Sequence, residues 1–407
     1  MIRKIADNIY SPLGVTTAEN YAAVKQGRSM LHSYPAGTMD LPEAFTASLF
    51  DWGRVEPLDG YTRFERIVIQ SVGRALAQTD VDVHSDRVLF VLSTTKGNVE
   101  LLDSRSQQFP ADRVLPGVAA RVIAAYFGFC REPLVVSNAC ISGLSAQITA
   151  MRLIESGACD VAVVCGADVQ SRFIISGFGS FKALSPMECR PFDIERLGLN
   201  LGEAAATVIY ERREERGERR EERGERIEER GERKEERGKA TGRRAQLGNE
   251  RIEWYAVCGA VRNDAFHISG PSPKGEGSYR AIRAAMGDTP ADELAFINVH
   301  GTSTMYNDEM ESAAIDRAGL LDVPVNSLKG YYGHTMGAAG VLETILSMAA
   351  VDDGCILGTR GYEELGVSHR VCVSGQHAAT TKQSFLKLLS GFGGCNAAML
   401  FKKGGAQ

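Results

Sequence analysis

The sequence predicts an α/β protein with buried, largely parallel sheets, arranged as two domains or one large duplicated fold. Three observations lead to this prediction. The chain has 407 residues, more than one ordinary hydrophobic core needs. Apolar residues make up 44% of it, enough for a packed interior. Short β-branched runs alternate with helical stretches of small residues on both sides of one highly charged segment.

The expected elements follow from that alternation. Apolar, β-branched runs predict buried strands, and they lie at residues 87–93, 134–137, 160–166, 205–210, 254–261, 294–299 and 370–374. Stretches rich in small and apolar residues predict helices at 141–156 and 338–350. Glycines at 337 and 340 would let the second helix approach another backbone closely. We expect an N-terminal domain at 1–212, an insertion at 213–247 and a C-terminal domain at 248–407.

The charged segment, residues 211–238, consists of four copies of a seven-residue unit such as ERREERG. Ile227 is the only apolar residue among its non-glycine positions, so the repeat has no seam that a coiled coil could bury. A glycine ends every unit and costs about 1 kcal/mol of helix stability each time. The segment therefore reads as a solvated insertion between two domains, and the alternative is a docking arm for a partner.

Composition excludes several classes of protein. The net charge is −5 and the isoelectric point is about 5.9, whereas a nucleic-acid-binding protein is more often basic. No run of eighteen apolar residues predicts a membrane span, and the N-terminus shows no secretory signal. Nine scattered cysteines with no C-x-x-C pair favour free thiols in a reducing cytoplasm. No metal site or bound cofactor is expected.

Cys140 is the first candidate for chemistry. It stands in SNACISG, between a predicted strand that ends near Ser137 and a predicted helix that starts near Ile141. At a helix N-terminus, free N–H groups and the helix dipole favour a thiolate and would lower the pKa of this thiol. The same N–H groups could bind an oxyanion. The alternative is a buried, inert thiol.

Two histidines follow in the second half of the chain. His300 closes a predicted strand and enters the loop HGTST, where Thr302 and Thr304 offer hydroxyls to a polar ligand. Asp308 and Glu311 would hold this loop or cap the next helix. His334 lies five residues after Lys329, in SLKGYYGHTMGAAG, and the same segment leads into an apolar helix that contains Glu343. Such an acid needs a partner, and Lys329 is the expected one. In a fourth segment, GFGGCNAA, Gly391 and Gly393 flank Phe392 in a turn that can aim a backbone N–H at a ligand.

Taken together, these segments resemble the β-ketoacyl-acyl-carrier-protein synthases of the thiolase superfamily, in particular the elongating type I/II condensing enzymes. The likeness runs from SPLG at the N-terminus through NACISG, RPFD, GLNLGEAA, HGTST and SLKGYYGHTMGAAG to GFGGCNAA. It implies a thiolase-like five-layered αβαβα fold of two similar halves. It also implies a homodimer, in which the strand before Cys140 pairs across the twofold axis. The charged insertion has no counterpart in that family.

The resemblance also implies the chemistry. Cys140 would form an acyl-enzyme with an acyl thioester carried on the phosphopantetheine arm of an acyl carrier protein. His300 and His334 would stabilise the enolate formed when malonyl-carrier protein loses CO2. Lys329 and Glu343 would support the histidines, and the N–H groups of Cys140 and Phe392 would form an oxyanion hole. Thr302 and Thr304 match pantetheine-binding positions, Phe392 matches a gate, and Gly391 and Gly393 complete the substrate-binding set.

Alternatives remain at this stage. The chain could be the active subunit of a heterodimer with a chain-length partner, a non-decarboxylating thiolase-type acyltransferase, or a cysteine hydrolase. Ser390 stands where many elongating synthases have Phe, and Ala204, after Glu203 in GLNLGEAA, stands where a glycine is more familiar. Both departures touch loops near the substrate path. They leave polyene or other secondary-metabolite assembly open beside fatty acid synthesis.

Overall fold

The computed structural model describes residues 2–102, 109–213 and 253–404. The predicted insertion at 213–247 and the heptad repeat therefore lie outside the described residues, except for Glu211–Arg213 at the start of the repeat. Within the described ranges, no helix combines the length and the apolar character needed to cross a lipid bilayer.

A mixed sheet of eleven strands runs through the described part of the chain. From one edge to the other, its strands are β13 (Cys372–Val373), β11 (Pro324–Asn326), β10 (Leu294–Asn298), β15 (Ser384–Gly391), β16 (Cys395–Gly404), β9 (Glu253–Asn263), β1 (Ile2–Tyr10), β8 (Ala204–Arg212), β6 (Val161–Asp168), β4 (Val88–Ser93) and β5 (Leu134–Val136). Each of the seven predicted strands is present, with bounds shifted by a few residues.

The sheet contains the same five-strand pattern twice. In the N-terminal half, β5, β4 and β6 are parallel, and β8 and β1 continue the sheet antiparallel. In the C-terminal half, β11, β10 and β15 are parallel, and β16 and β9 continue antiparallel. The halves meet where β1 pairs with β9. The prediction of largely parallel sheets is thus only partly right, because buried antiparallel strands have the same apolar composition as parallel ones.

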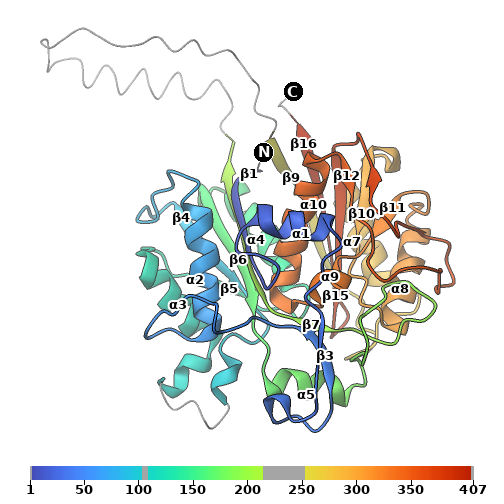
Figure 1. Ribbon diagram of the computed structural model, residues 1–407. Helices are drawn as coiled ribbons and strands as arrows, with labels where there is room; N and C mark the ends of the chain where they lie inside the picture. Colours follow the sequence, from blue (N-terminus) through green and yellow to red (C-terminus); the bar gives the residue numbers. More distant parts are fainter. Residues whose placement is uncertain (1, 103–108, 214–252, 405–407) are drawn as a thin grey trace, which may run out of the picture.

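Two helices lie between the halves. They are α4 (Ser142–Glu155) and α10 (Ala339–Asp352), and they pack against each other in the middle of the molecule (Figure 1). A Cβ atom added to Gly340 would lie 2.3 Å from the backbone nitrogen of Leu144. The expected close approach of this helix to another backbone is therefore confirmed, and any side chain at position 340 would separate the two halves.

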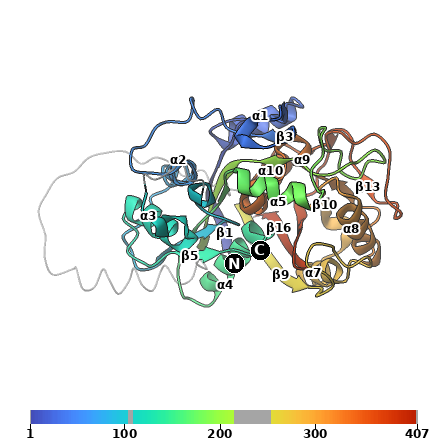
Figure 2. The same cartoon turned by 90° about the horizontal axis from the view of Figure 1, so that it is seen from below.

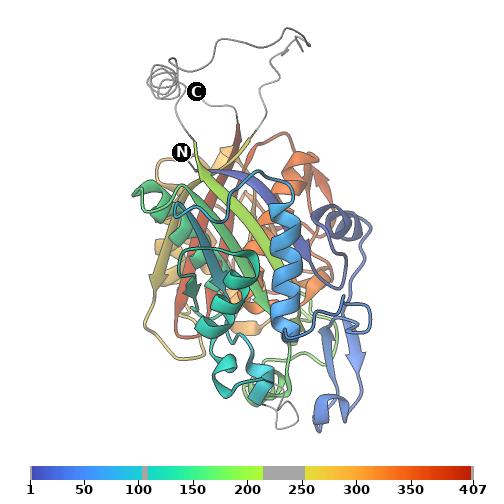
Figure 3. The same ribbon diagram turned by 90° about the vertical axis from the view of Figure 1, so that its left-hand side faces the viewer.

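Outer helices complete the layers. In the N-terminal half, α2 (Arg63–Leu76) and α3 (Pro116–Phe127) cover the outer face of the strands (Figure 3). In the C-terminal half, α7 (Glu276–Met286) and α8 (Met305–Arg317) lie on the opposite outer side (Figure 2). The N-terminal outer helices, the N-terminal half of the sheet, the central helices, the C-terminal half of the sheet and the C-terminal outer helices make five layers. This is the thiolase-like αβαβα fold that the resemblance implies.

Shorter elements surround this framework. They are α1 (Thr17–Lys25), α5 (Arg172–Ser180), α9 (Lys329–Tyr332), the small sheet of β2 (His32–Tyr34), β3 (Phe45–Ser48) and β7 (Leu201–Gly202), and the pair β12 (Cys355–Ile356) and β14 (Ala378–Ala379). Of these, α5 and α9 matter most for the site, because α5 lies over its mouth and α9 precedes one of its histidines.

Candidate active site

Cys140 lies in the short connection between β5 and α4. The preceding residue, Ala139, adopts a left-handed conformation with φ of 45°, which turns the chain sharply before the helix. Ser142 holds this turn, because its hydroxyl donates to the Ala139 carbonyl at 2.6 Å and accepts from the Asn138 N–H at 2.8 Å. The turn thus fixes the thiol at the base of a cavity, where Cys140 is only 7% exposed.

His300 follows β10, and the acids at the start of α8 fix its loop. The Glu311 carboxylate accepts the N–H groups of His300 and Gly301, both at 2.7 Å. Asp308 accepts the Thr302 N–H at 3.0 Å. Burial raises the pKa of Glu311 to about 7 and that of Asp308 to about 6, although the N–H groups favour the charged forms. These acids bond to the loop's backbone and do not line the cavity.

His334 lies in the segment after α9, and its hydrogen bonds define its tautomer. Its Nδ1 atom accepts the Met336 N–H at 3.3 Å, so the neutral ring carries its proton on Nε2. Nε2 is buried and has no hydrogen-bond partner among the described residues. The two imidazole rings meet edge to face, with centroids 5.0 Å apart. The site therefore contains an unpaired N–H donor beside a second imidazole.

The three predicted groups converge in one place. The Cys140 Sγ and one ring nitrogen from each of His300 and His334 lie within 4.8 Å of one another, and all three residues are buried. Burial lowers the pKa of both histidines well below 6.5, and the positive charge of Lys329 lowers it further. Both rings are therefore uncharged at neutral pH.

The cavity over these groups has a volume of about 550 Å³. Thr302, Thr304 and Gly391 contribute to its lining, and the two threonine hydroxyls bond to each other at 2.9 Å. Gly393 does not line the cavity, and its N–H donates to the Ile268 carbonyl at 2.7 Å. The structure therefore separates Gly393 from the other predicted substrate-binding residues.

Phe392 lies at the mouth of this cavity, on the turn between β15 and β16. Its ring packs against Phe178 of α5 with centroids 5.7 Å apart, and against Phe181 at 5.5 Å. Its backbone N–H donates to the Cys140 thiol, and a Cβ on Gly391 would lie 3.1 Å from the Cys140 nitrogen. One residue thus covers the cavity with its ring and points its amide at the sulfur. No sequence pattern predicted the two aromatic partners, Phe178 on α5 and Phe181 just after it.

The electrostatics of Cys140 correct one expectation. Burial raises the pKa of its thiol to about 11, and the nearby Lys329 charge and the Phe392 N–H only partly offset this effect. The expected lowering by the helix N-terminus is therefore wrong for this state of the site. The physical reason is that near-complete burial of the sulfur penalises the thiolate more than the neighbouring charge and amide stabilise it.

This pKa predicts slow, pH-dependent alkylation of Cys140. Because iodoacetamide reacts with the thiolate, the modification rate at Cys140 should keep rising from pH 7 to pH 10 without reaching a plateau. Peptide mass spectrometry of timed samples measures the rate at this one cysteine, with the exposed Cys130 as an internal reference for access to reagent. A plateau below pH 8 would contradict the raised pKa.

Behind the histidines lies a buried cluster of three charged side chains. Glu343 accepts from Lys329 Nζ at 2.8 Å through one carboxylate oxygen, as the sequence predicted. Its other oxygen accepts from Lys387 Nζ at 2.6 Å. Lys387 was not predicted from the sequence, although one signal was visible there: a lysine in the otherwise apolar run SFLKLL needs a buried partner.

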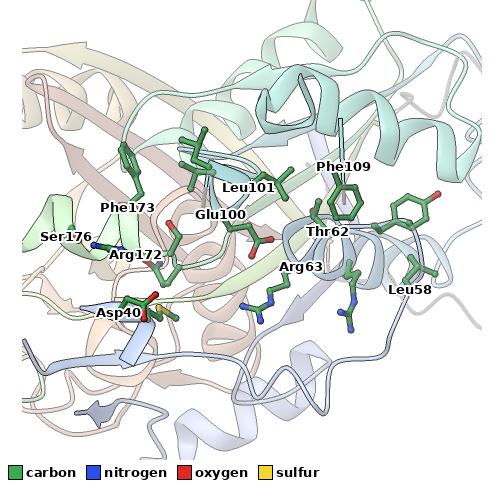
Figure 4. Close-up of a pocket in the computed structure, with 18 of the residues that line it drawn as sticks. Asp40, Leu58, Thr62, Arg63, Glu100, Leu101, Phe109, Arg172, Phe173 and Ser176 are labelled. Carbon is green, nitrogen blue, oxygen red and sulfur yellow. The ribbon is translucent and has the colours of Figure 1, made fainter. Parts of the chain in front are cut away.

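A larger cavity of about 1250 Å³ lies apart from this site, between α2 and α5 (Figure 4). Arg63 and Glu100 contribute to its wall on one side, and Arg172 and Phe173 on another. None of the predicted catalytic or substrate-binding residues lines it. The chemistry that the sequence predicts is thus concentrated in the smaller cavity.

Comparison with known proteins agrees with this arrangement. "Nodulation protein E" of Rhizobium leguminosarum bv. trifolii is 28% identical over 312 residues, which cover 74% of this chain and 70% of that protein. "3-oxoacyl-[acyl-carrier-protein] synthase 2" of Rhizobium meliloti is 32% identical over 284 residues, 66% of this chain and 60% of that protein. A solved ketosynthase, ApeO in complex with its chain length factor ApeC from Xenorhabdus doucetiae, shares the fold. It superposes with a TM-score of 0.80 at 24% identity, and the match covers 98% of this chain and 97% of that one.

Family models cover most of the chain. The model of the β-ketoacyl synthase N-terminal domain matches residues 7–216, which include Cys140. The model of the C-terminal domain matches residues 255–363, which include His300 and His334. With these matches, the fold and the convergent Cys-His-His set, the chain belongs to the β-ketoacyl synthase family of acyltransferases.

Proposed function

We propose that this β-ketoacyl synthase catalyses the decarboxylative condensation of an acyl thioester with malonyl-acyl-carrier protein, giving β-ketoacyl-acyl-carrier protein. The observation that carries the proposal is the meeting of one thiol and two uncharged imidazoles, within 4.8 Å, at the base of a cavity. A thiol can hold an acyl group, and two neutral N–H donors can stabilise an enolate. Together they provide for both halves of the reaction.

In the first half, the Cys140 sulfur attacks the thioester carbonyl of the acyl donor. The backbone N–H groups of Cys140 and Phe392 would bind the oxyanion. The Phe392 N–H already points toward the reacting sulfur, because it donates to the Cys140 Sγ. Collapse breaks the bond to the pantetheine sulfur. That sulfur leaves as a thiol with the proton lost by Cys140, and an acyl-Cys140 thioester remains. Because the thiol pKa is raised, this proton transfer is part of the step.

In the second half, malonyl-carrier protein occupies the cavity. Breaking its carbon–carboxylate bond releases CO2 and leaves an electron pair on the thioester enolate. The Nε2–H of His334 is positioned as one donor to the enolate oxygen, and His300 supplies the second. The enolate carbon then attacks acyl-Cys140. This forms the new carbon–carbon bond, and the released Cys140 sulfur takes up a proton from water.

The surrounding residues have supporting roles in this proposal. Lys329 and Glu343 set charge beside the histidines, and Asp308 and Glu311 fix the His300 loop. Thr302 and Thr304 would bind the pantetheine arm from the cavity wall, with Gly391 beside them. Phe392 would open between the acyl and malonyl stages by leaving its aromatic partners. Gly393 would act only through the shape of the turn, with φ of 82°.

Carrier-bound phosphopantetheine is the only cofactor that the proposed reaction needs, and an acyl carrier protein is the proposed partner. The name of the 3-oxoacyl-acyl-carrier-protein synthase 2 relative supports this partner. Nine free cysteines are consistent with the proposed reducing, cytoplasmic setting. The repeated five-strand pattern supports a division into halves at 1–212 and 248–407, with the charged segment inserted between them. No nucleic acid is proposed as a partner.

We further propose that two chains associate through β5. This strand forms one edge of the sheet, and its residues are only half-buried in the single chain. An edge strand with free backbone groups can pair with the same strand of a second copy. The second subunit could also be a ketosynthase-like chain, since the solved ketosynthase ApeO is in complex with a chain length factor. Cys140 would make the present chain the active member of such a pair.

Product analysis tests the proposed reaction against a thiolase and a hydrolase. A panel of acyl-carrier-protein thioesters is incubated with the enzyme, with and without malonyl-carrier protein, and intact masses are recorded. We expect an acyl adduct on the enzyme, then a carrier-bound product longer by two carbons, with one CO2 released per product. Free acid as the main product would indicate a hydrolase. Chain extension from acetyl thioester without CO2 release would indicate a thiolase-type acyltransferase.

A further inference from the structure

Lys387 is an unusual residue in the interior of this fold. It lies on β15 with no exposed surface, five residues before Phe392. Its Nζ donates to the Glu343 carboxylate at 2.6 Å and to the Leu388 carbonyl at 3.0 Å. It also donates to the carbonyls of Val299 at 3.3 Å and Asn298 at 3.4 Å. The ammonium group therefore connects α10, its own strand and the end of the strand that carries His300.

A second cation also contacts this carboxylate. Lys329 Nζ donates to the other oxygen of Glu343 at 2.8 Å, and both lysines are almost completely buried. Two ammonium groups share this one carboxylate. The Glu311 carboxylate, which accepts the N–H groups of His300 and Gly301, also lies near enough to interact with both lysines. Burying a second cation against Glu343 is costly, and Lys329 already pairs with this acid, so Lys387 is not needed merely to neutralise it. The position beside the two imidazoles suggests what the charge is for.

We propose that Lys387 is a positioning residue of the condensation site, which ties down the end of the His300 strand and supplies a second positive charge, besides Lys329, near His300 and His334. The proposal rests on the proposed function for its effect on rate. The charge would add to burial and to Lys329 in opposing protonation of both imidazoles, so that each presents one N–H donor. It would also favour the negative charge that develops on the enolate oxygen.

Other titratable groups surround the histidine pair and have to be counted. Cys140 faces it from the turn before α4, Lys329 from α9, Glu343 from α10, Lys387 from β15, and Asp308 and Glu311 from α8. The two α8 acids bond to backbone N–H groups, and burial raises their pKa values to about 6 and about 7. Burial also lowers the pKa of Lys387 to about 8, despite Glu343, so this lysine is mostly protonated at neutral pH and below.

The test replaces Lys387 by methionine, which has a similar length and no charge. The variant leaves a balanced Lys329–Glu343 pair, so we expect it to fold. NMR of protein with labelled histidine side chains follows the seven histidines as the pH falls from 8, with His300→Gln and His334→Gln variants assigning the two buried signals. Without the Lys387 charge, both should take up protons at a pH higher by roughly one unit. Malonyl decarboxylation should fall about tenfold in kcat, the size expected for one charge near the reacting oxygen, with KM unchanged.

Lys402→Met provides the matched control, because Lys402 lies on the adjacent strand β16 but is half-exposed and pairs with Glu293 at the surface. It should change neither readout. If the methionine variant does not fold, Lys387→Gln keeps one donor for Glu343 and allows the same measurements. A folded variant in which both histidines titrate as in the parent overturns the proposal, even if its rate falls, because a merely structural lysine would give that result. If the unmodified enzyme does not decarboxylate malonyl-carrier protein at all, the proposed function is refuted. The histidine titration would then still test the effect of the Lys387 charge.

Discussion

Replacing Cys140 by alanine is expected to abolish acyl loading and condensation completely, while malonyl decarboxylation continues. The reason is that Cys140 is the only cysteine among the described residues that line the cavity, whereas both imidazole donors remain in the variant. Labelled acyl-carrier protein measures transfer of the acyl group to the enzyme. Release of CO2 from malonyl-carrier protein measures the other half-reaction separately.

Cys395→Ala is the matched control for this experiment. Cys395 lies in the glycine-rich C-terminal segment, only partly buried and outside the lining of the cavity. Thiolases use a second cysteine in a C-terminal motif, so loss of activity in this variant would favour a thiolase-type reaction. Product formation at the parental rate by a folded Cys140→Ala enzyme would show that the covalent mechanism is wrong.

Replacing either His300 or His334 by alanine is expected to slow malonyl decarboxylation by a few hundredfold. Each change removes one N–H donor to the developing enolate, and loss of a comparable oxyanion donor costs about 3–4 kcal/mol. Loading of Cys140 should suffer less, because the Phe392 N–H and the Lys329 charge remain beside the sulfur. The same two partial assays give the contrast: the cysteine variant loses the first half-reaction, and the histidine variants lose the second.

His84→Ala supplies the control, since this exposed side chain lies outside the cavity and its Nδ1 contacts the Gly128 carbonyl at 2.9 Å. Circular dichroism and thermal unfolding should show that all variants are folded. If both His300→Ala and His334→Ala release CO2 at the parental rate, the two-donor enolate site does not exist. A thiolase-type or hydrolytic reaction would then have to be considered again.

Local sequence patterns alone determine many of the strands and helices of this protein and the family to which it belongs. The alternation of apolar runs and helical stretches predicted the buried strands and the helices 141–156 and 338–350, because backbone periodicity is a local property. The glycines around α10 predicted its close packing, since only a residue without a side chain fits there. The motifs around Cys140, His300 and His334 also indicated the family that the comparisons show.

Tertiary structure alone decided the state of those groups. Cys140, His300 and His334 come from segments far apart in the chain, and their distances depend on how two halves pack around α4 and α10. Whether a helix N-terminus lowers a thiol pKa depends on how much water the rest of the fold removes, and here burial dominates. Lys387 shows the same limit: its sequence neighbours mark it as buried, but its bond to Glu343 joins a strand and a helix that only the folded chain brings together. The sequence thus specified which groups could react, and the packing of the whole molecule specified their charge and their partners.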